Sequence, residues 1–216
     1  VDAVAFEDRV YVADPGNGLV KVFDKASGEP VKSIGDRGEP EERLDKPTNL
    51  AFDGEGYLYV TDVGRFQVVK FDRDGHFKAA IGRPGDNLGH FGRPKGLALD
   101  REGHLLVVDA SFNNVQVFGK DGRLLLFFGD GGQERGQFLL PAKVAVDYDN
   151  LRYFEKYVQP EFQVLYLIFV TSQFGERPVS VLAYGQERGK PYPTDEELLK
   201  RIEERRRIEQ EKQQKP

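Results

Sequence analysis

The chain contains no cysteine, no methionine and no tryptophan, and only three histidines among its 216 residues. Without cysteine it has no disulfide, no thiolate metal site, no cysteine nucleophile and no covalent haem attachment through C-x-x-C-H. Without methionine, Val1 cannot be an initiator, so the sequence predicts that an upstream segment was removed by processing or by truncation.

Long apolar runs and single-sign charge are also missing. The longest apolar run, VLYLIFV at 164–170, is far shorter than the roughly 18 residues that a membrane-spanning helix needs. The 31 basic and 36 acidic residues are interspersed along the chain, and the net charge is -5. We therefore expect no membrane-spanning segment and no nucleic-acid partner, because nucleic-acid binding needs a clustered basic surface.

What the sequence does contain is a repeat. Aligned on the acid that ends an apolar-Ala-apolar-Asp strand, the copies place Asp53, Asp100 and Asp147 at steps of 47 residues. The other repeated positions are Asp14, Asp62 and Asp109, then Gly35, Gly82 and Gly129, then Pro47, Pro94 and Pro141. A fixed period of this length is typical of repeat architectures and determines the fold.

Each copy contains four short strands. In the second copy they are residues 48–53, 57–62, 67–72 and 77–82, and turns rich in Gly and Asp separate them. One such sheet cannot bury both of its faces, so neighbouring copies must stack. The sequence therefore predicts an all-β protein, a β-propeller of four-stranded antiparallel blades.

The repeated residues have structural tasks. Gly75, Gly122 and either Gly56 or Gly103 supply the positive φ that a tight turn needs. The Asp that ends the second strand of each copy can accept hydrogen bonds from N–H groups of the following turn. We interpret these positions as blade architecture and not as catalytic groups.

These motifs resemble the NHL-repeat family of β-propellers. They appear as VDAVAFEDRVYVADPGNGLVKVF, PTNLAFDGEGYLYVTDVGRFQVVKF and PKGLALDREGHLLVVDASFNNVQVF, and in divergent form as PAKVAVD with LIFVTSQFGERPVSVLAYG. The resemblance covers residues 1–185. It implies the propeller fold and no single activity, because the family hosts many functions.

The strand count predicts an incomplete ring. Three copies supply four strands each and the fourth supplies three, which gives 15, so the last blade lacks its outer strand. We expect the chain to be part of a six-bladed ring whose remaining strands lie upstream. The alternative is an open arc that another chain completes.

The fourth copy carries an insertion at residues 148–163, YDNLRYFEKYVQPEFQ, between its first two strands. Leu151, Phe154 and Tyr157 or Val158 lie at helical spacing before Pro160, so one or two turns of helix are expected. Such an insertion is expected to project near the channel mouth. We predict a partner-binding surface made of Tyr148, Tyr153, Phe154, Tyr157 and Phe162, because interfaces favour aromatic side chains. A lid packed on its own propeller is the alternative.

The predicted organisation is four blades (1–47, 48–94, 95–141 and 142–185), a linker at 186–193 and a tail at 194–216. Thr194 and Glu197 form a capping-box pattern, so the tail is predicted to be a charged helix. Its few apolar residues are the expected docking strip on the propeller or on a neighbour; they are Leu198, Leu199 and Ile202, with Ile208 beyond.

Catalytic motifs are scarce. His76, His90 and His104 fall in a turn between outer strands, a connection between blades and a turn between inner strands, so they are not expected to share a metal. No G-x-S-x-G, H-E-x-x-H or Walker pattern occurs. The sequence predicts that the chain is not an enzyme and binds no cofactor, with calcium on axial carbonyl groups as an alternative.

Two functions remain open. The first is a non-catalytic interaction scaffold, for which the resemblance implies an extracytoplasmic location and a multihaem c-type cytochrome as partner in an electron-transfer assembly. The second is a propeller hydrolase or lyase whose axial metal site is supplied by blades upstream.

Overall fold

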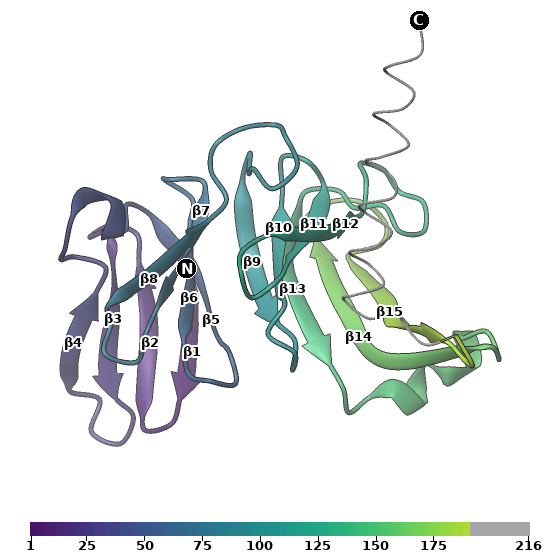
Figure 1. Ribbon diagram of the computed structural model, residues 1–216, viewed down its shortest axis with the longest axis horizontal. Helices are drawn as coiled ribbons and strands as arrows, with labels where there is room; N and C mark the ends of the chain where they lie inside the picture. The colour runs from purple at the N-terminus through teal and green to yellow at the C-terminus, as the bar shows by residue number, and fades with distance from the viewer. Residues whose placement is uncertain (191–216) are drawn as a thin grey trace, which may run out of the picture. The chain divides into compact units, whose positions relative to one another are not determined.

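The computed structural model describes residues 1–190, and within them the chain forms 15 strands and three short 3-10 turns. The strands belong to four antiparallel sheets, and each sheet takes its strands in chain order, so every sheet is a meander (Figure 1). The predicted all-β architecture and the predicted number of strands are therefore confirmed. No helix among these residues is long and apolar enough to cross a membrane.

The first three sheets have four strands each and are named blades 1 to 3. Blade 1 contains β1 (Ala3–Phe6), β2 (Arg9–Asp14), β3 (Leu19–Asp24) and β4 (Pro30–Ile34). Blade 2 contains β5 (Pro47–Phe52), β6 (Leu58–Asp62), β7 (Gln67–Phe71) and β8 (Phe77–Ile81), and the turn η1 (Pro40–Glu42) precedes it. Blade 3 contains β9 (Pro94–Leu99), β10 (Leu105–Asp109), β11 (Asn114–Phe118) and β12 (Leu124–Phe128).

Blade 4 has three strands, as the repeat predicts: β13 (Pro141–Asp147), β14 (Phe162–Ser172) and β15 (Val179–Glu187). In all four blades the first strand is the inner one and lies at one edge of its sheet. β15 continues to Glu187, so the first two residues of the predicted linker belong to a strand.

The cores lie between neighbouring blades. One cluster joins blade 1 to blade 2 and includes Tyr11, Val22, Leu50 and Phe71, each at most 6% exposed. A second cluster joins blade 2 to blade 3 and includes Tyr59, Phe91, Leu105 and Phe118. Each sheet therefore buries a face on the next one, which is why a single copy could not fold alone.

The turns have the backbone geometry that the repeat implies. The four turn glycines have φ between +78° and +89°, a region that other residues rarely adopt; they are Gly56, Gly75, Gly103 and Gly122. Asp109, at the end of β10, accepts hydrogen bonds from the N–H groups of Ser111 and Phe112 in the following turn, at 2.9 and 3.3 Å. It also accepts bonds from Gly92 and Arg93, at 2.7 and 3.0 Å, and so fixes the entry of the chain into blade 3.

The chain divides into two compact units. The first consists of Val1–Asp147 and Leu167–Leu182 and contains the stacked blades. The second, within the described residues, consists of Tyr148–Tyr166 and residues 183–190, so it holds the insertion together with the far ends of β14 and β15.

The insertion is helical only in short pieces. The one or two helical turns expected here are present as two 3-10 turns, η2 (Leu151–Tyr153) and η3 (Glu155–Tyr157). Asn150 occupies the cap position of η2, and the N–H of Phe154 donates to the carbonyl of Leu151 at the other end of the turn. The predicted charged C-terminal helix, with Leu198, Leu199 and Ile202, lies outside the described residues.

Candidate functional site

The insertion does not present its five predicted aromatic residues as one patch. Tyr148 packs on Tyr166 with ring centroids 5.1 Å apart, and Tyr166 stacks on Tyr184 at 4.6 Å. Tyr148 is therefore committed to an internal stack. Phe154 is half-buried, and its carbonyl accepts the N–H of Tyr157 at 2.9 Å, which closes η3.

Tyr153 and Tyr157 do face solvent. They are 58% and 73% exposed, which is unusual for large aromatic residues. Arg152 lies over the ring of Tyr153 at 4.8 Å and donates to its hydroxyl oxygen at 2.8 Å, and Lys156 lies over the ring of Tyr157 at 4.9 Å. The two rings are thus each flanked by a cation and present an amphipathic surface.

A groove of about 620 Å³ runs beside Tyr157. Its lining includes the apolar residues Phe162 and Ala183 and the charged residues Glu161, Glu187 and Lys190. Phe162 leans over Gly185, where a Cβ atom would lie 2.8 Å from its ring. Of the five predicted residues, Tyr157 and Phe162 therefore meet at one groove, which we call the insertion groove.

A cluster of polar side chains lies at the inner strands of the first unit. The Asp2 carboxylate accepts hydrogen bonds from the ammonium of Lys143 at 2.5 Å and from the Leu50 N–H at 3.3 Å. The Asn49 side-chain amide lies at 3.5 Å from the same oxygen. Burial raises the pKa of Asp2, but the Lys143 hydrogen bond and charge outweigh it, so the pKa is lowered overall.

Blade 3 adds two more cations at the inner strands. Lys95, at the start of β9, is half-buried, and its carbonyl accepts the Thr61 hydroxyl at 2.7 Å. Arg93 precedes it by two residues and is exposed. Burial lowers the pKa of the Lys95 ammonium, and the positive charge of Arg93 lowers it further.

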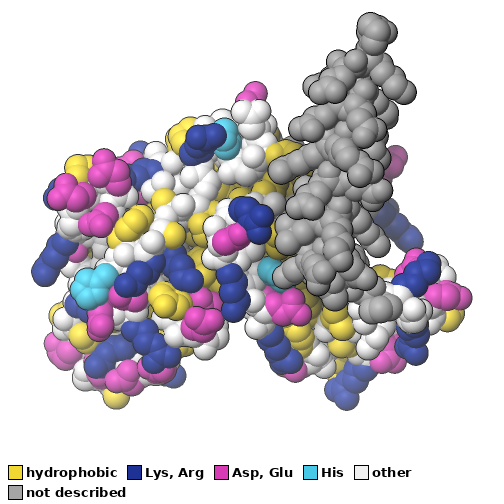
Figure 2. Space-filling view, in the orientation of Figure 1, with side chains coloured by type: hydrophobic (Ala, Val, Ile, Leu, Met, Phe, Trp, Pro, Cys, Tyr) yellow, Lys and Arg dark blue, Asp and Glu magenta, His cyan; other side chains and the backbone are white. Residues whose placement is uncertain are grey.

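The three histidines lie in three different places, as the repeat predicts. His76 follows β7, His104 follows β9, and His90 lies in the connection between β8 and β9, where it accepts a hydrogen bond from Arg83 at 2.6 Å. Figure 2 shows basic and acidic side chains intermingled on the face that it draws, with no wide region of one sign.

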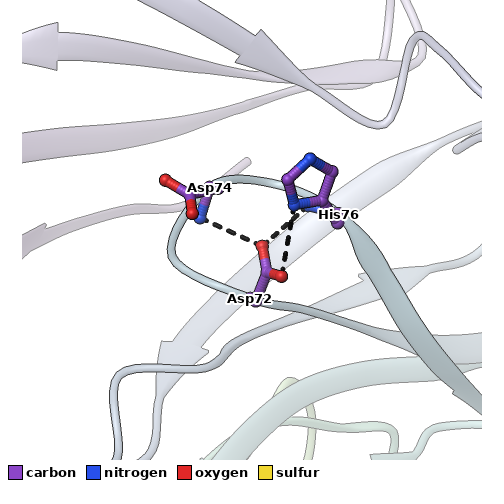
Figure 3. Close-up of side chains that lie close together, drawn as sticks. All are labelled: Asp72, Asp74 and His76. Carbon is purple, nitrogen blue, oxygen red and sulfur yellow. Dashed lines mark hydrogen bonds and ion pairs between the residues drawn. The ribbon is translucent and has the colours of Figure 1, made fainter.

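Two of these histidines are nevertheless close to acids of their own turns. Asp72, Asp74 and His76 lie close together (Figure 3), and so do Asp100, Glu102 and His104, with one potential ligand atom of each within 4.8 Å of the others. In the first turn, one oxygen of Asp72 accepts the N–H groups of Asp74 and His76 at 3.0 and 2.9 Å. The acid therefore holds the turn closed, and the histidine proximity follows from that turn.

Comparisons with known proteins identify the fold. No family model matches the chain, and no curated protein matches it. A streptogramin B lyase structure matches with a TM-score of 0.54 and 15% identity, over 84% of this chain and 53% of that one. The chain has a β-propeller fold.

Two other solved structures also match the chain in fold. Hydrazine synthase from Kuenenia stuttgartiensis matches with a TM-score of 0.56 and 12% identity, over 82% of this chain and 43% of that one. A protein assigned by name as a gluconolactonase matches with a TM-score of 0.57 and 18% identity, over 81% of this chain and 56% of that one. The chain spans about half the length of these structures.

These neighbours correct one prediction. The sequence predicted that the chain is not an enzyme, from its scarce histidines and missing motifs. That inference was wrong, because structures that share the fold are named as lyases and as a gluconolactonase. A propeller without catalytic motifs in a single copy is therefore compatible with catalysis, since a propeller can assemble a site from residues on several blades.

The polar residues at the inner strands were missed by sequence reasoning. Asp2 and Lys143 come from opposite ends of the propeller sequence, and no local pattern links them. Comparing the copies position by position could have found Lys95, because the corresponding residues are Thr48 in blade 2 and Ala142 in blade 4. The acid-x-acid-x-His spacing could have found the two histidine turns.

Proposed function

We propose that this chain is part of a longer NHL-type β-propeller that binds a protein partner through the insertion of its fourth blade. The observation that carries the proposal is the exposure of Tyr153 and Tyr157, 58% and 73%, together with the insertion groove that Tyr157 lines. Exposed aromatic rings at the rim of an apolar groove are typical of residues that dominate binding energy. This surface is compatible with a catalytic centre elsewhere in the propeller.

The partner that we propose is a multihaem c-type cytochrome in an extracytoplasmic electron-transfer assembly. This part rests on the resemblance to long NHL proteins whose last blade carries an aromatic insertion and a FVTSQFG strand. The chain would supply the binding surface and the cytochrome the haem groups.

The experiment measures binding of the 216-residue chain to a purified multihaem c-type cytochrome from the same source, followed by haem absorbance and biolayer interferometry. Replacing both Tyr153 and Tyr157 by Ser is expected to weaken binding at least about tenfold. Phe174→Ser is the matched control, because Phe174 is 62% exposed but lies outside the insertion. Equal loss in the control, or unchanged binding of the double variant, would exclude the insertion as the contact surface. Absence of binding to any haem protein would exclude the cytochrome.

A lyase or hydrolase is the second candidate. It is favoured by the polar side chains that three blades bring together at the inner strands, namely Asp2, Asn49 and Lys143. An axial metal site would need further ligands from additional blades. The test is the sequence of the parent protein: His, Glu or Asn at the positions equivalent to Asn49 in other copies would support this candidate, and apolar residues at all of them would reject it.

A further inference from the structure

Blade 3 begins with two cations for which residues 1–190 supply no ion-pair partner. Lys95 is the second residue of β9, and Arg93 stands two residues before it, on the other side of Pro94. Within residues 1–190, neither the Lys95 ammonium nor the Arg93 guanidinium has an ion pair or a hydrogen bond. A half-buried ammonium without an acceptor is costly, because burial removes water that would otherwise solvate it.

The electrostatic surroundings of Lys95 also indicate that its ammonium has no compensating negative charge within residues 1–190. The two influences on its pKa are burial and the charge of Arg93, and both disfavour the charged ammonium. A structural lysine normally gains a carboxylate partner that raises its pKa. For Lys95, the charge that shifts its pKa is that of Arg93, which is also positive.

Two acids beside the inner strands, Asp109 and Asp2, are already engaged. Asp109 accepts four backbone N–H groups, from 2.7 to 3.3 Å, at the start of blade 3 and in the turn after β10. Asp2, the acid on the inner end of blade 1, accepts the Lys143 ammonium. Both carboxylates are thus satisfied without contacting Lys95.

The other blades show that blade formation does not require these cations. At the position of Lys95, blade 2 has Thr48 and blade 4 has Ala142, and at the position of Arg93, blade 4 has Leu140. All of these blades form the same meander. The pair of cations is therefore specific to blade 3 and serves something other than the fold.

The segment is also held rigidly. A Cβ atom on Gly96 would lie 2.5 Å from the Cα of Lys143 and 2.7 Å from the carbonyl oxygen of Ala142, so β9 and β13 run in direct backbone contact. The Thr61 hydroxyl fixes the carbonyl of Lys95 itself. A charged group on such a backbone is pre-organised for a ligand.

We propose that the start of β9 binds an oxyanion, a carboxylate or a phosphate group, between the ammonium of Lys95 and the guanidinium of Arg93. Arg93 lies in the bend that leads into β9 and Lys95 is the second residue of that strand, and the charge of Arg93 acts on the Lys95 ammonium, so both cations can address one anion. The guanidinium supplies paired N–H donors that match two oxygens, and the ammonium supplies a point charge. This inference does not rest on the partner-binding function.

The experiment titrates the 216-residue chain with inorganic phosphate and, separately, with succinate, by isothermal calorimetry at constant ionic strength. Saturable binding at one site is expected for at least one of the two anions. Phosphate alone would indicate a phosphorylated ligand, and succinate alone would indicate a carboxylate ligand. No saturable binding of either would overturn the proposal.

Two variants locate the site, and the repeat provides their control. Lys95→Thr and Arg93→Leu introduce residues that other blades carry at these positions, and each is expected to weaken binding about tenfold. Lys46→Leu removes the cation that occupies the position of Arg93 in blade 2 and is expected to leave the affinity unchanged within about twofold. Equal weakening by Lys46→Leu would mean non-specific charge attraction and would overturn the proposal.

A second readout does not depend on calorimetry. The bound anion should slow acylation of Lys95 by acetic anhydride, measured by mass spectrometry of the digested chain, while acylation of the exposed Lys120 stays unchanged. Equal rates at Lys95 with and without saturating anion would contradict the assignment even if calorimetry showed binding.

Discussion

The Lys143 ammonium donates a hydrogen bond to the Asp2 carboxylate at 2.5 Å, although 141 positions separate the two residues. Lys143 belongs to the inner strand of blade 4, and Asp2 directly precedes the inner strand of blade 1 (Figure 1). The same carboxylate binds the Leu50 N–H of blade 2. One acid therefore links three blades of the first unit, and its replacement should lower the free energy of unfolding.

Asp2→Asn should destabilise the chain at neutral pH and not at acid pH. The pKa of Asp2 is lowered in the fold, so its contribution is present above the unfolded pKa of about 3.9 and is lost as the pH falls through the lower folded value. We expect a loss of about 1 kcal/mol in urea unfolding at pH 7, because Lys143 is partly exposed and water screens the pair. Well below the lowered folded pKa, the variant and the parent should unfold together. The exposed Asp8 provides the control variant Asp8→Asn, which should not change stability at either pH.

Gly96→Ala should be among the most damaging single-methyl changes in the chain. The added Cβ would lie 2.5 Å from the Cα of Lys143, and the contacted atoms are backbone that cannot turn away. We expect a loss of at least about 2 kcal/mol, from forced separation of β9 and β13. Gly54→Ala is the matched control, because nothing lies within 4 Å of a Cβ there. Denaturant midpoints that are equal for the two variants would contradict the backbone contact.

Asp109→Ala should cost about 3 kcal/mol, since it leaves several backbone N–H groups buried without an acceptor. Asp14 stands at the same position of blade 1, where its carboxylate is partly exposed and binds Asn17 and the ammonium of Lys21. Asp14→Ala should therefore cost clearly less. Thermal unfolding of both variants checks which substitution costs more stability. An equal loss of stability in the two variants would show that burial of this position does not matter.

The titration of Lys95 can be measured directly. Competitive acetylation across roughly pH 8 to 11 should give Lys95 a midpoint below the ordinary lysine value of 10.5. Arg93→Leu should raise that midpoint, because removing a like charge favours the ammonium, but burial should keep it from returning fully. Lys46→Leu should leave it unchanged. A midpoint that falls in Arg93→Leu would show that the two side chains do not repel each other.

The turn that contains His76 should depend on its acid and not on its histidine. Asp72 accepts the N–H groups of Asp74 and His76, so Asp72→Ala should cost about 1 kcal/mol in urea unfolding. His76→Ala removes an exposed ring and should leave the midpoint in place. The reverse order would indicate that the imidazole has a structural or ligand role in this turn.

Much of the fold followed from the sequence because its signals are local and repeated. The acids at 53, 100 and 147, the turn glycines and the prolines that begin the inner strands each act within a few residues, so their spacing predicts strands and turns directly. Within residues 1–190 the fourth blade has three strands, and its sequence there contains no pattern for an outer fourth strand.

The candidate sites could be predicted less well from the sequence. Tyr148 and Tyr153 look alike in the sequence, yet one stacks on Tyr166 and the other faces solvent, because their environment is set by the path of the insertion. The helical spacing from Leu151 to Tyr157 predicts a short helical segment, and the structure forms it as two separate 3-10 turns, a distinction that the spacing does not make. The Asp2 and Lys143 pair joins the two ends of the propeller sequence and could not be found from spacing alone.

Within residues 1–190, β15 has a neighbouring strand on one side only, and Val179 and Val181 on it are 52% and 39% exposed. An apolar strand with open main-chain groups is a template on which a foreign segment can extend the sheet. Unless another segment covers this edge, a high concentration of the chain should therefore favour edge-to-edge association through β15.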